Sequence, residues 1–244
     1  MLNCIARPLR GILFDKDGTL LDLESLWMPA AERTVDEVLR RYCGGDVSFR
    51  NELLLSVGIS DGHALPEGPL VAGTNGDAAF AMREVLLRHG VSPGKGFVGE
   101  TAVFLTRCAC GETTNVCPTC SGLAGILQKL RSHGLVLGLA TSDRPESALL
   151  HLQKLGIRQE FEFFGTDDGT FRPKPAPDLI RAFCGHFGFL PEECAVVGDS
   201  PNDMRFAAGG GSTGIFLSPA GCGELPPGAQ AVVRSLAELP GLLF

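Results

Sequence analysis

The stretch GILFDKDGT, residues 11–19, joins a short apolar run to two aspartates and a glycine. An apolar run without polar alternation is typical of a parallel strand that is covered on both faces. Helical patterns separate later runs of this kind, with Pro145 in the first turn of one helix and Ser200 as the cap of another. This alternation predicts an open, doubly wound parallel α/β sheet with right-handed crossovers. The later strands are expected at residues 135–140, 161–165, 194–198 and 213–217.

A long insertion follows the first predicted strand. Residues 27–42 and 77–89 have helical spacing, and no run comparable to the predicted strands lies between them. Because open α/β sheets bind ligands beyond the carboxyl ends of their strands, we expect the insertion to cover those ends. The predicted organisation is an α/β core formed by residues 1–21 and 121–244, with an inserted, mainly helical cap domain formed by residues 22–120.

The composition is that of a folded, acidic protein. Of 244 residues, 44% are apolar and 20% are charged, so the chain can bury a core. Lys and Arg number 21 against 28 Asp and Glu, and the net charge of −7 argues against nucleic-acid or membrane partners. The sequence contains neither the run of about 20 apolar residues that a membrane helix needs nor a secretory signal pattern. We therefore expect a cytoplasmic protein.

Polar residues follow the predicted strands at the points where the strands end. Asp15 and Asp17 come directly after the first strand, where ligands of such sheets bind. Several carboxylates in one place would force protonation unless a cation compensates them, and a hard ion such as Mg²⁺ prefers oxygen ligands. The other polar residues at or after the ends of predicted strands are Thr141, Lys174, Asp199 and Asp203.

With these residues in this order, the sequence resembles the haloacid dehalogenase superfamily, in the phosphatase branch that carries a helical cap and includes phosphoglycolate phosphatases. The resemblance covers the first 22 residues and residues 135–217. It implies a Rossmann-like core, Mg²⁺ as the cofactor, and hydrolysis of a small phosphate monoester through an aspartyl-phosphate intermediate. The expected partner is therefore a small phosphorylated metabolite.

The resemblance also implies a role for each motif residue. Asp15 would be the nucleophile that attacks phosphorus, and Asp17 would act as general acid and base. Thr141, Ser142 and Lys174 would bind the phosphate oxygens. The implied Mg²⁺ ligands are Asp15, Asp17, Asp199 and Asp203.

The second aspartate of the first motif favours one branch of this superfamily. An alkoxide leaving group needs a proton, which Asp17 can supply, whereas a departing halide needs none. Asp17 therefore favours a phosphatase over a dehalogenase. A sugar phosphomutase would use the same motifs and stays open as an alternative.

Four cysteines lie close together in the predicted cap, with one, six and two residues between them: Cys108, Cys110, Cys117 and Cys120. Four thiolates can hold one tetrahedral Zn²⁺, so this pattern predicts a structural zinc knuckle, with free thiols or an oxidised pair as alternatives. Four protein ligands would leave no coordination position for substrate, so the zinc would brace the cap. A knuckle also raises a non-catalytic alternative, a regulatory or protein-binding module. Nucleic acid is a poor partner because residues 108–120 contain no Lys or Arg.

Overall fold

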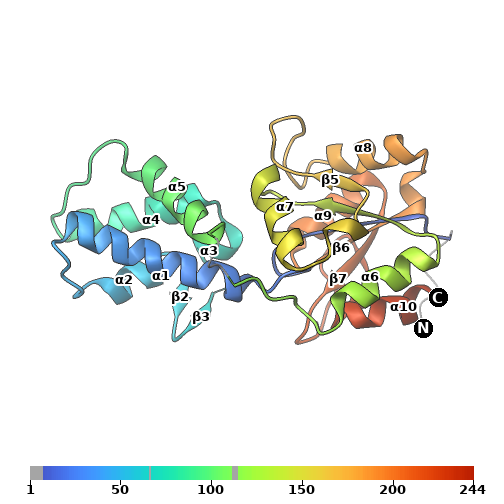
Figure 1. Cartoon of the computed structure of the whole chain (residues 1–244), viewed down its shortest axis with the longest axis horizontal. Helices are drawn as coiled ribbons and strands as arrows, with labels where there is room; N and C mark the ends of the chain where they lie inside the picture. Colours follow the sequence, from blue (N-terminus) through green and yellow to red (C-terminus); the bar gives the residue numbers. More distant parts are fainter. Residues whose placement is uncertain (1–7, 66, 112–114) are drawn as a thin grey trace. The chain divides into compact units, whose positions relative to one another are not determined.

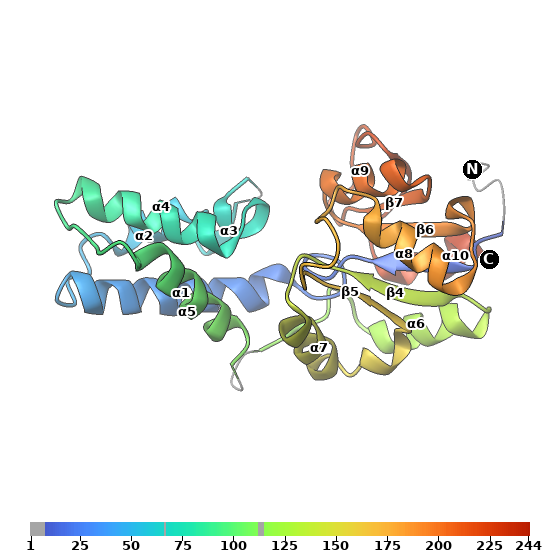
Figure 2. The same ribbon diagram turned by 90° about the horizontal axis from the view of Figure 1, so that it is seen from above.

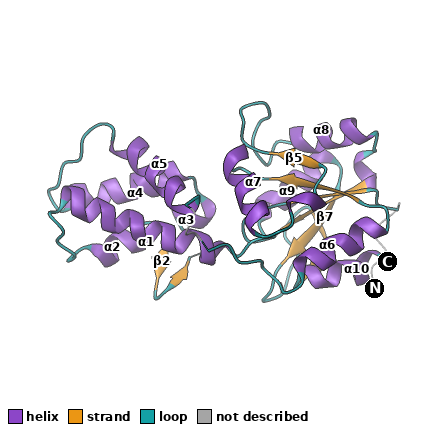
Figure 3. Cartoon of the chain, in the orientation of Figure 1, coloured by secondary structure: helices purple, strands orange, loops and turns teal. Residues whose placement is uncertain are grey.

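The computed structural model describes residues 8–65, 67–111 and 115–244, and it divides the chain into two compact units. The first unit combines residues 1–22 with residues 117–244, and the second is Leu23–Val116 (Figure 1). The predicted α/β core corresponds to the first unit. The second unit is mainly helical (Figure 3).

The first unit contains a sheet of six strands in the order β5-β4-β1-β6-β7-β8, and all neighbours are parallel. The chain runs outward from the central β1 to one edge and then returns to build the other side. Such a reversal of strand order marks the place where open sheets bind ligands. The strands are β1 Gly11–Phe14, β4 Val136–Ala140, β5 Phe163–Gly165, β6 Cys194–Gly198, β7 Thr213–Leu217 and β8 Ala229–Val233.

Helices cover both faces of this sheet (Figure 2). Successive side chains of a strand point to opposite faces, so Ile12 and Phe14 pack in one apolar cluster and Leu13 in another. The first cluster includes α6 Leu123–Ser132, α7 Pro145–Lys154 and α10 Leu239–Leu243. The second includes α8 Asp178–Phe187 and α9 Pro201–Gly210. The parallel α/β core predicted from the apolar runs is therefore confirmed.

Two elements of the core were not predicted. Strand β8 has the sequence AQAVV and alternates between exposed and buried residues, so it lacks the continuous apolar run of the inner strands. β8 lies at the edge of the sheet, where a strand is covered less completely than the inner strands are. Helix α10 was not predicted either. Short one-turn helices complete the unit at Arg158–Glu160, Pro191–Glu193 and Leu236–Glu238.

The second unit is built around three helices, α1, α4 and α5, which bury apolar residues such as Trp27, Met82 and Leu105. The capping box of α4 explains where this helix begins, because Thr74 and Asp77 each bond the other's backbone N–H. Helix α5 was not predicted. The helices are α1 Leu23–Tyr42, α2 Arg50–Ser56, α3 Pro69–Ala72, α4 Asn75–Arg88 and α5 Phe97–Ala109, with a short hairpin of β2 Ile59–Ser60 and β3 His63–Ala64. No helix in the described part of the chain is long and apolar enough to cross a membrane.

The second unit ends at Val116, four residues before the expected cap boundary at residue 120. Backbone contacts explain why residues 117–120 belong to the first unit. The Asp22 N–H donates to the Cys117 carbonyl at 2.8 Å, and the Thr119 N–H donates to the Leu20 carbonyl at 3.2 Å. The Thr119 hydroxyl also donates to the Thr19 carbonyl at 2.5 Å. This segment is therefore tied to the chain that follows β1.

Gly214 in β7 provides a test of the close packing at the sheet edge. A Cβ atom there would lie 2.4 Å from the Gly228 carbonyl oxygen, a backbone atom that cannot rotate away. We expect Gly214→Ala to lower the free energy of unfolding by about 1–3 kcal/mol, measured by urea denaturation. The matched control is Gly125→Ala in α6, where a Cβ meets nothing within 4 Å. That change should raise stability by about 0.5–1 kcal/mol, because glycine is a poor helix former. Equal effects of the two changes would contradict the packing argument.

Candidate active site

Three neighbouring strands bring the predicted site residues to one edge of the sheet. Asp15 follows β1, Thr141 follows β4 and Asp199 follows β6, and β1 lies between the other two strands. Backbone bonds extend the pairing past the strand ends, because the Asp15 N–H donates to the Val197 carbonyl at 2.9 Å. Parallel strands end at the same edge of a sheet, so residues far apart in the sequence meet there.

Three carboxylates form a group that could hold a metal ion. One side-chain oxygen from each of Asp15, Asp199 and Asp203 lies within 4.8 Å of the others. Carboxylate oxygens suit a hard cation such as Mg²⁺ better than a soft one. The donor set therefore fits the ion that the sequence predicts. Asp17 was also predicted as a ligand, but its carboxylate is not part of this group.

Lys174 neutralises part of this negative charge. Its ammonium donates to the Asp15 carboxylate and, at 2.6 Å, to Oδ1 of Asp203. Burial alone would lower the pKa of Lys174, but the two carboxylates outweigh burial and raise that pKa above its ordinary value. Lys174 therefore stays charged and links Asp15, the predicted nucleophile, to Asp203.

Burial and mutual repulsion favour protonation of the carboxylates. Burial is the main cause that raises the pKa of Asp15 well above its ordinary value, and Asp203 and Asp199 add to the rise against the opposing effect of Lys174. Burial and then Asp203 raise the pKa of Asp199 to about 6, although a bond from the Thr19 hydroxyl at 3.0 Å works against the rise. The site is thus short of positive charge, which a divalent cation would supply.

The first turn of α9 holds Asp203 in place. Ser200 caps this helix as predicted, and its hydroxyl donates to Oδ2 of Asp203 at 2.5 Å. The Asp203 N–H donates to the Ser200 hydroxyl at 3.2 Å, and the Ser200 N–H donates to Oδ2 of Asp203 at 3.3 Å, so the two residues form a capping box. One oxygen of Asp203 therefore serves the helix cap while the other accepts the bond from Lys174.

The loop after β4 contains the two residues predicted to bind phosphate. Thr141 is buried, and its hydroxyl accepts a bond from the Asp143 N–H at 3.2 Å. Ser142, the next residue, is exposed. The loop thus turns back on itself directly beyond the strand. The phosphate-binding roles of Thr141 and Ser142 stay predictions.

Gly18 allows the first and last motifs to approach each other. A Cβ atom on this residue would lie 2.2 Å from Oδ2 of Asp199, and the backbone φ of +78° is one that glycine adopts most readily. The glycine of the DKDGT motif is therefore required by the contact with Asp199.

A second charged cluster, formed by Lys16, Asp17, Asp143 and His151, was not predicted from the sequence. Lys16 has no exposed surface and contacts both Asp17 and Asp143. His151 is also fully buried and lies 3.2 Å from the ammonium of Lys16. The position of Lys16 between two aspartates was the one sign of this cluster in the sequence. Asp143 and His151 lie 127 and 135 residues further along the chain, so their contacts with Lys16 could not be predicted.

The four cysteines of the predicted zinc knuckle are divided between the two units. Cys108 and Cys110 belong to the second unit, and Cys117 and Cys120 belong to the first. Residues 112–114, between the two pairs, lie outside the described part of the chain. The zinc site stays a prediction.

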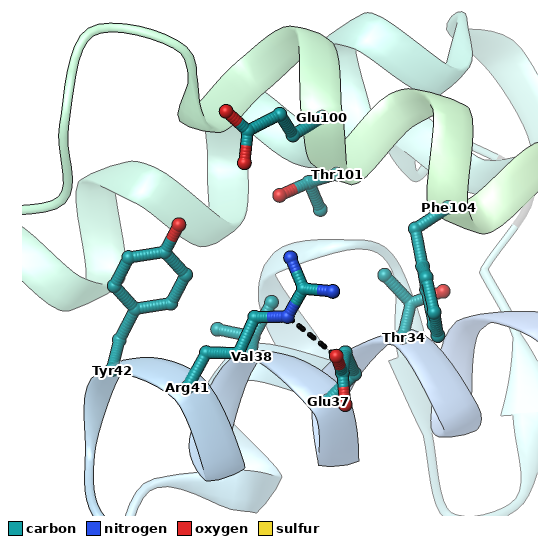
Figure 4. Close-up of a pocket in the computed structure, with 8 residues that line it drawn as sticks. All are labelled: Thr34, Glu37, Val38, Arg41, Tyr42, Glu100, Thr101 and Phe104. Carbon is teal, nitrogen blue, oxygen red and sulfur yellow. Dashed lines mark hydrogen bonds and ion pairs between the residues drawn. The ribbon is translucent and has the colours of Figure 1, made fainter.

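A pocket within the second unit holds none of the predicted catalytic residues (Figure 4). It lies between α1 and α5, and the Arg41 guanidinium donates to Glu37 beside it at 2.5 Å. Polar and apolar side chains alternate around this charged pair, and they do not form a recognisable catalytic or metal-binding group. Its lining residues are Thr34, Glu37, Val38, Arg41, Tyr42, Glu100, Thr101 and Phe104.

The family model of haloacid dehalogenase-like hydrolases matches residues 9–211. The chain is 27% identical to the plasmid phosphoglycolate phosphatase of Cupriavidus necator, covering 98% of this chain and 95% of that protein. It is also 27% identical to the pyrophosphatase PpaX of Bacillus velezensis, covering 84% and 82%.

Solved structures share the fold. A predicted phosphoglycolate phosphatase from Haemophilus somnus superposes with a TM-score of 0.71 at 16% identity, over 98% of this chain and 100% of that one. The magnesium-bound hydrolase YfnB from Bacillus subtilis gives 0.72 at 16% identity, over 97% and 99%. These similarities extend the shared fold across nearly the whole chain.

Magnesium should stabilise the chain in a pH-dependent way. The pKa of Asp199 is raised from 3.8 to about 6, so this group stabilises the metal-free fold most below pH 3.8, and that contribution is lost as the pH rises through 6. Mg²⁺ needs the ionised carboxylates, so it should raise the melting temperature at about pH 7.5 and raise it less at about pH 5. Differential scanning fluorimetry measures both shifts, with NaCl of equal ionic strength as the control. A shift of the same size in Asp199→Asn would count against this metal site.

Proposed function

Because the chain belongs to the haloacid dehalogenase-like hydrolases, we propose that it is a Mg²⁺-dependent phosphatase that hydrolyses a small phosphate monoester through an aspartyl-phosphate intermediate. The membership and the hydrolase class predicted from the sequence are confirmed. The observation that carries the proposal is the contact of Lys174 with both Asp15 and Asp203 at the ends of the strands. This arrangement places the proposed nucleophile, Asp15, beside the ammonium of Lys174, which can bind the negatively charged phosphate of the substrate.

Relatives favour a small substrate. Two phosphoglycolate phosphatases align with 97% and 98% of this chain, at 25% and 27% identity. We therefore place phosphoglycolate and similarly small phosphate monoesters first among the candidates. The pyrophosphatase PpaX adds inorganic pyrophosphate to the compounds worth testing.

In the first step, a carboxylate oxygen of Asp15 attacks phosphorus, and the bond from phosphorus to the ester oxygen breaks. Asp17 gives its proton to that oxygen, so the leaving group departs as a neutral alcohol. Lys174, Thr141 and Ser142 bind the phosphate oxygens and lower the cost of gathering negative charge. The product of this step is a phosphate group bound covalently to Asp15.

In the second step, the Asp17 carboxylate takes a proton from a water molecule as the water oxygen attacks phosphorus. The bond from phosphorus to Asp15 breaks, which regenerates the free carboxylate and releases inorganic phosphate. Asp17 recovers the proton that it gave away, so the cycle balances. Splitting the reaction in this way replaces one difficult displacement by two easier ones.

The group formed by Asp15, Asp199 and Asp203 would hold the magnesium ion. When bound, Mg²⁺ supplies positive charge that offsets the carboxylates and the phosphate. Since Asp17 stands outside this group, we assign its carboxylate to proton transfer and not to coordination.

The second unit would serve as the cap that selects the substrate. A sugar phosphomutase of the same superfamily would produce an isomer without net phosphate release, and a regulatory or protein-binding module would show no turnover.

The structural zinc and the cytoplasmic location also stay predictions. Metal analysis of the purified chain, at one zinc per chain, would test the former.

Replacing the nucleophile should abolish turnover. We expect Asp15→Asn to lower phosphate release by at least about 1,000-fold, because an amide cannot attack phosphorus in this way. Phosphate release is measured with Mg²⁺ on 2-phosphoglycolate, pyrophosphate, sugar phosphates, nucleotides and p-nitrophenyl phosphate. Asp36→Asn on the exposed side of α1 is the matched control and should keep full activity. Activity retained in folded Asp15→Asn would exclude the covalent mechanism.

The loss in Asp17→Asn should depend on the leaving group. An alkyl phosphate leaves as a basic alkoxide and needs the proton, whereas p-nitrophenolate leaves without one. We expect kcat to fall about 100-fold or more for alkyl phosphates and much less for p-nitrophenyl phosphate. Steady-state kinetics with both substrates measures the ratio. An equal loss for both would argue against the acid role.

A further inference from the structure

A buried ammonium group lies beside the proposed general acid and has no role in the mechanism so far. Lys16 has no exposed surface, although it stands between two motif aspartates. Its Nζ lies 2.6 Å from Oδ1 of Asp17, 3.1 Å from Oδ2 of Asp143 and 3.2 Å from Nδ1 of His151. The three partners come from the loop after β1, the loop after β4 and helix α7.

The chemistry of an ammonium group makes this contact set specific. A lysine ammonium can only donate hydrogen bonds, and here it donates to Asp17, meets Nδ1 of His151 and forms an ion pair with Asp143. His151 must therefore accept at Nδ1, which places its single ring proton on Nε2 and leaves the imidazole neutral. These three contacts give Lys16 one favoured position.

Charge balance keeps Lys16 ionised. The carboxylates of Asp17 and Asp143, at 2.6 and 3.1 Å, supply the negative charge that balances the buried ammonium. A buried charge without partners would cost several kcal/mol, so the group is stable only as a set. The same contacts that stabilise Lys16 hold the Asp17 carboxylate.

We propose that Lys16 is a positioning residue for Asp17, anchored by Asp143 and His151. By binding Oδ1, Lys16 restricts the rotamer of Asp17 and holds its carboxylate in one position for the proton exchange with substrate and water. A short side chain can otherwise occupy several rotamers, and a misplaced acid loses much of its catalytic effect. This inference rests on the proposed function, because it assumes that Asp17 transfers the proton.

A double-mutant cycle tests this inference. Lys16→Met should lower kcat about 10- to 100-fold for alkyl phosphates, with less loss for p-nitrophenyl phosphate and little change in KM. In Asp17→Asn, where no acid remains to be positioned, adding Lys16→Met should cause no further loss. Losses that multiply, or that are equal for both substrates, would overturn the inference. Lys129→Met, an exposed position on α6, is the matched control and should behave as the unchanged chain.

A second variant guards against misfolding. Lys16→Met leaves two carboxylates facing each other, so its melting temperature is measured first. If it unfolds, Lys16→Met with Asp143→Asn removes one charge of each sign and takes its place in the same cycle, with the same expected results. If the unchanged chain releases no phosphate from any substrate, the proposed function fails and the inference fails with it. If the unchanged chain is active and the losses multiply, only the inference fails.

Discussion

The active centre depends on the repulsion among carboxylates that the sheet brings together. Asp15, Asp199 and Asp203 place oxygens within 4.8 Å of one another at a largely buried edge, where water screens their charges only weakly. Lys174 compensates only part of this charge, and burial together with the charge of Asp203 raises the pKa of Asp199 to about 6. The uncompensated negative charge suits this site to a divalent cation.

The order of the strands makes this crowding unavoidable. β1 lies between β4 and β6, so the three strand ends that carry Asp15, Thr141 and Asp199 are direct neighbours. Both faces of β1 are covered by helices, and its apolar residues have no exposed surface. The apolar core therefore fixes the positions of polar groups that would otherwise move apart.

Two buried lysines divide the negative charge of the first motif. Lys174 binds Asp15 and Asp203, while Lys16 binds Asp17 and Asp143. Two aspartates that are only two residues apart are thus held in separate environments. Such a separation suits one carboxylate to attack and the other to move protons, because neighbouring carboxylates with a shared environment would compete for one proton.

The sequence by itself determined the inner strands β1, β4, β6 and β7 and the motif residues at their ends, because a short apolar run and its flanking turn are local features. It also indicated the helix cap at Ser200, which depends on a partner three residues away. Only the tertiary structure decided that Asp17 stands outside the carboxylate group and contacts Lys16. The same holds for His151, which is 135 residues from Lys16, and for the cysteines that are divided between the two units. These contacts join distant segments, and their positions follow from how the sheet and the helices pack rather than from any local pattern.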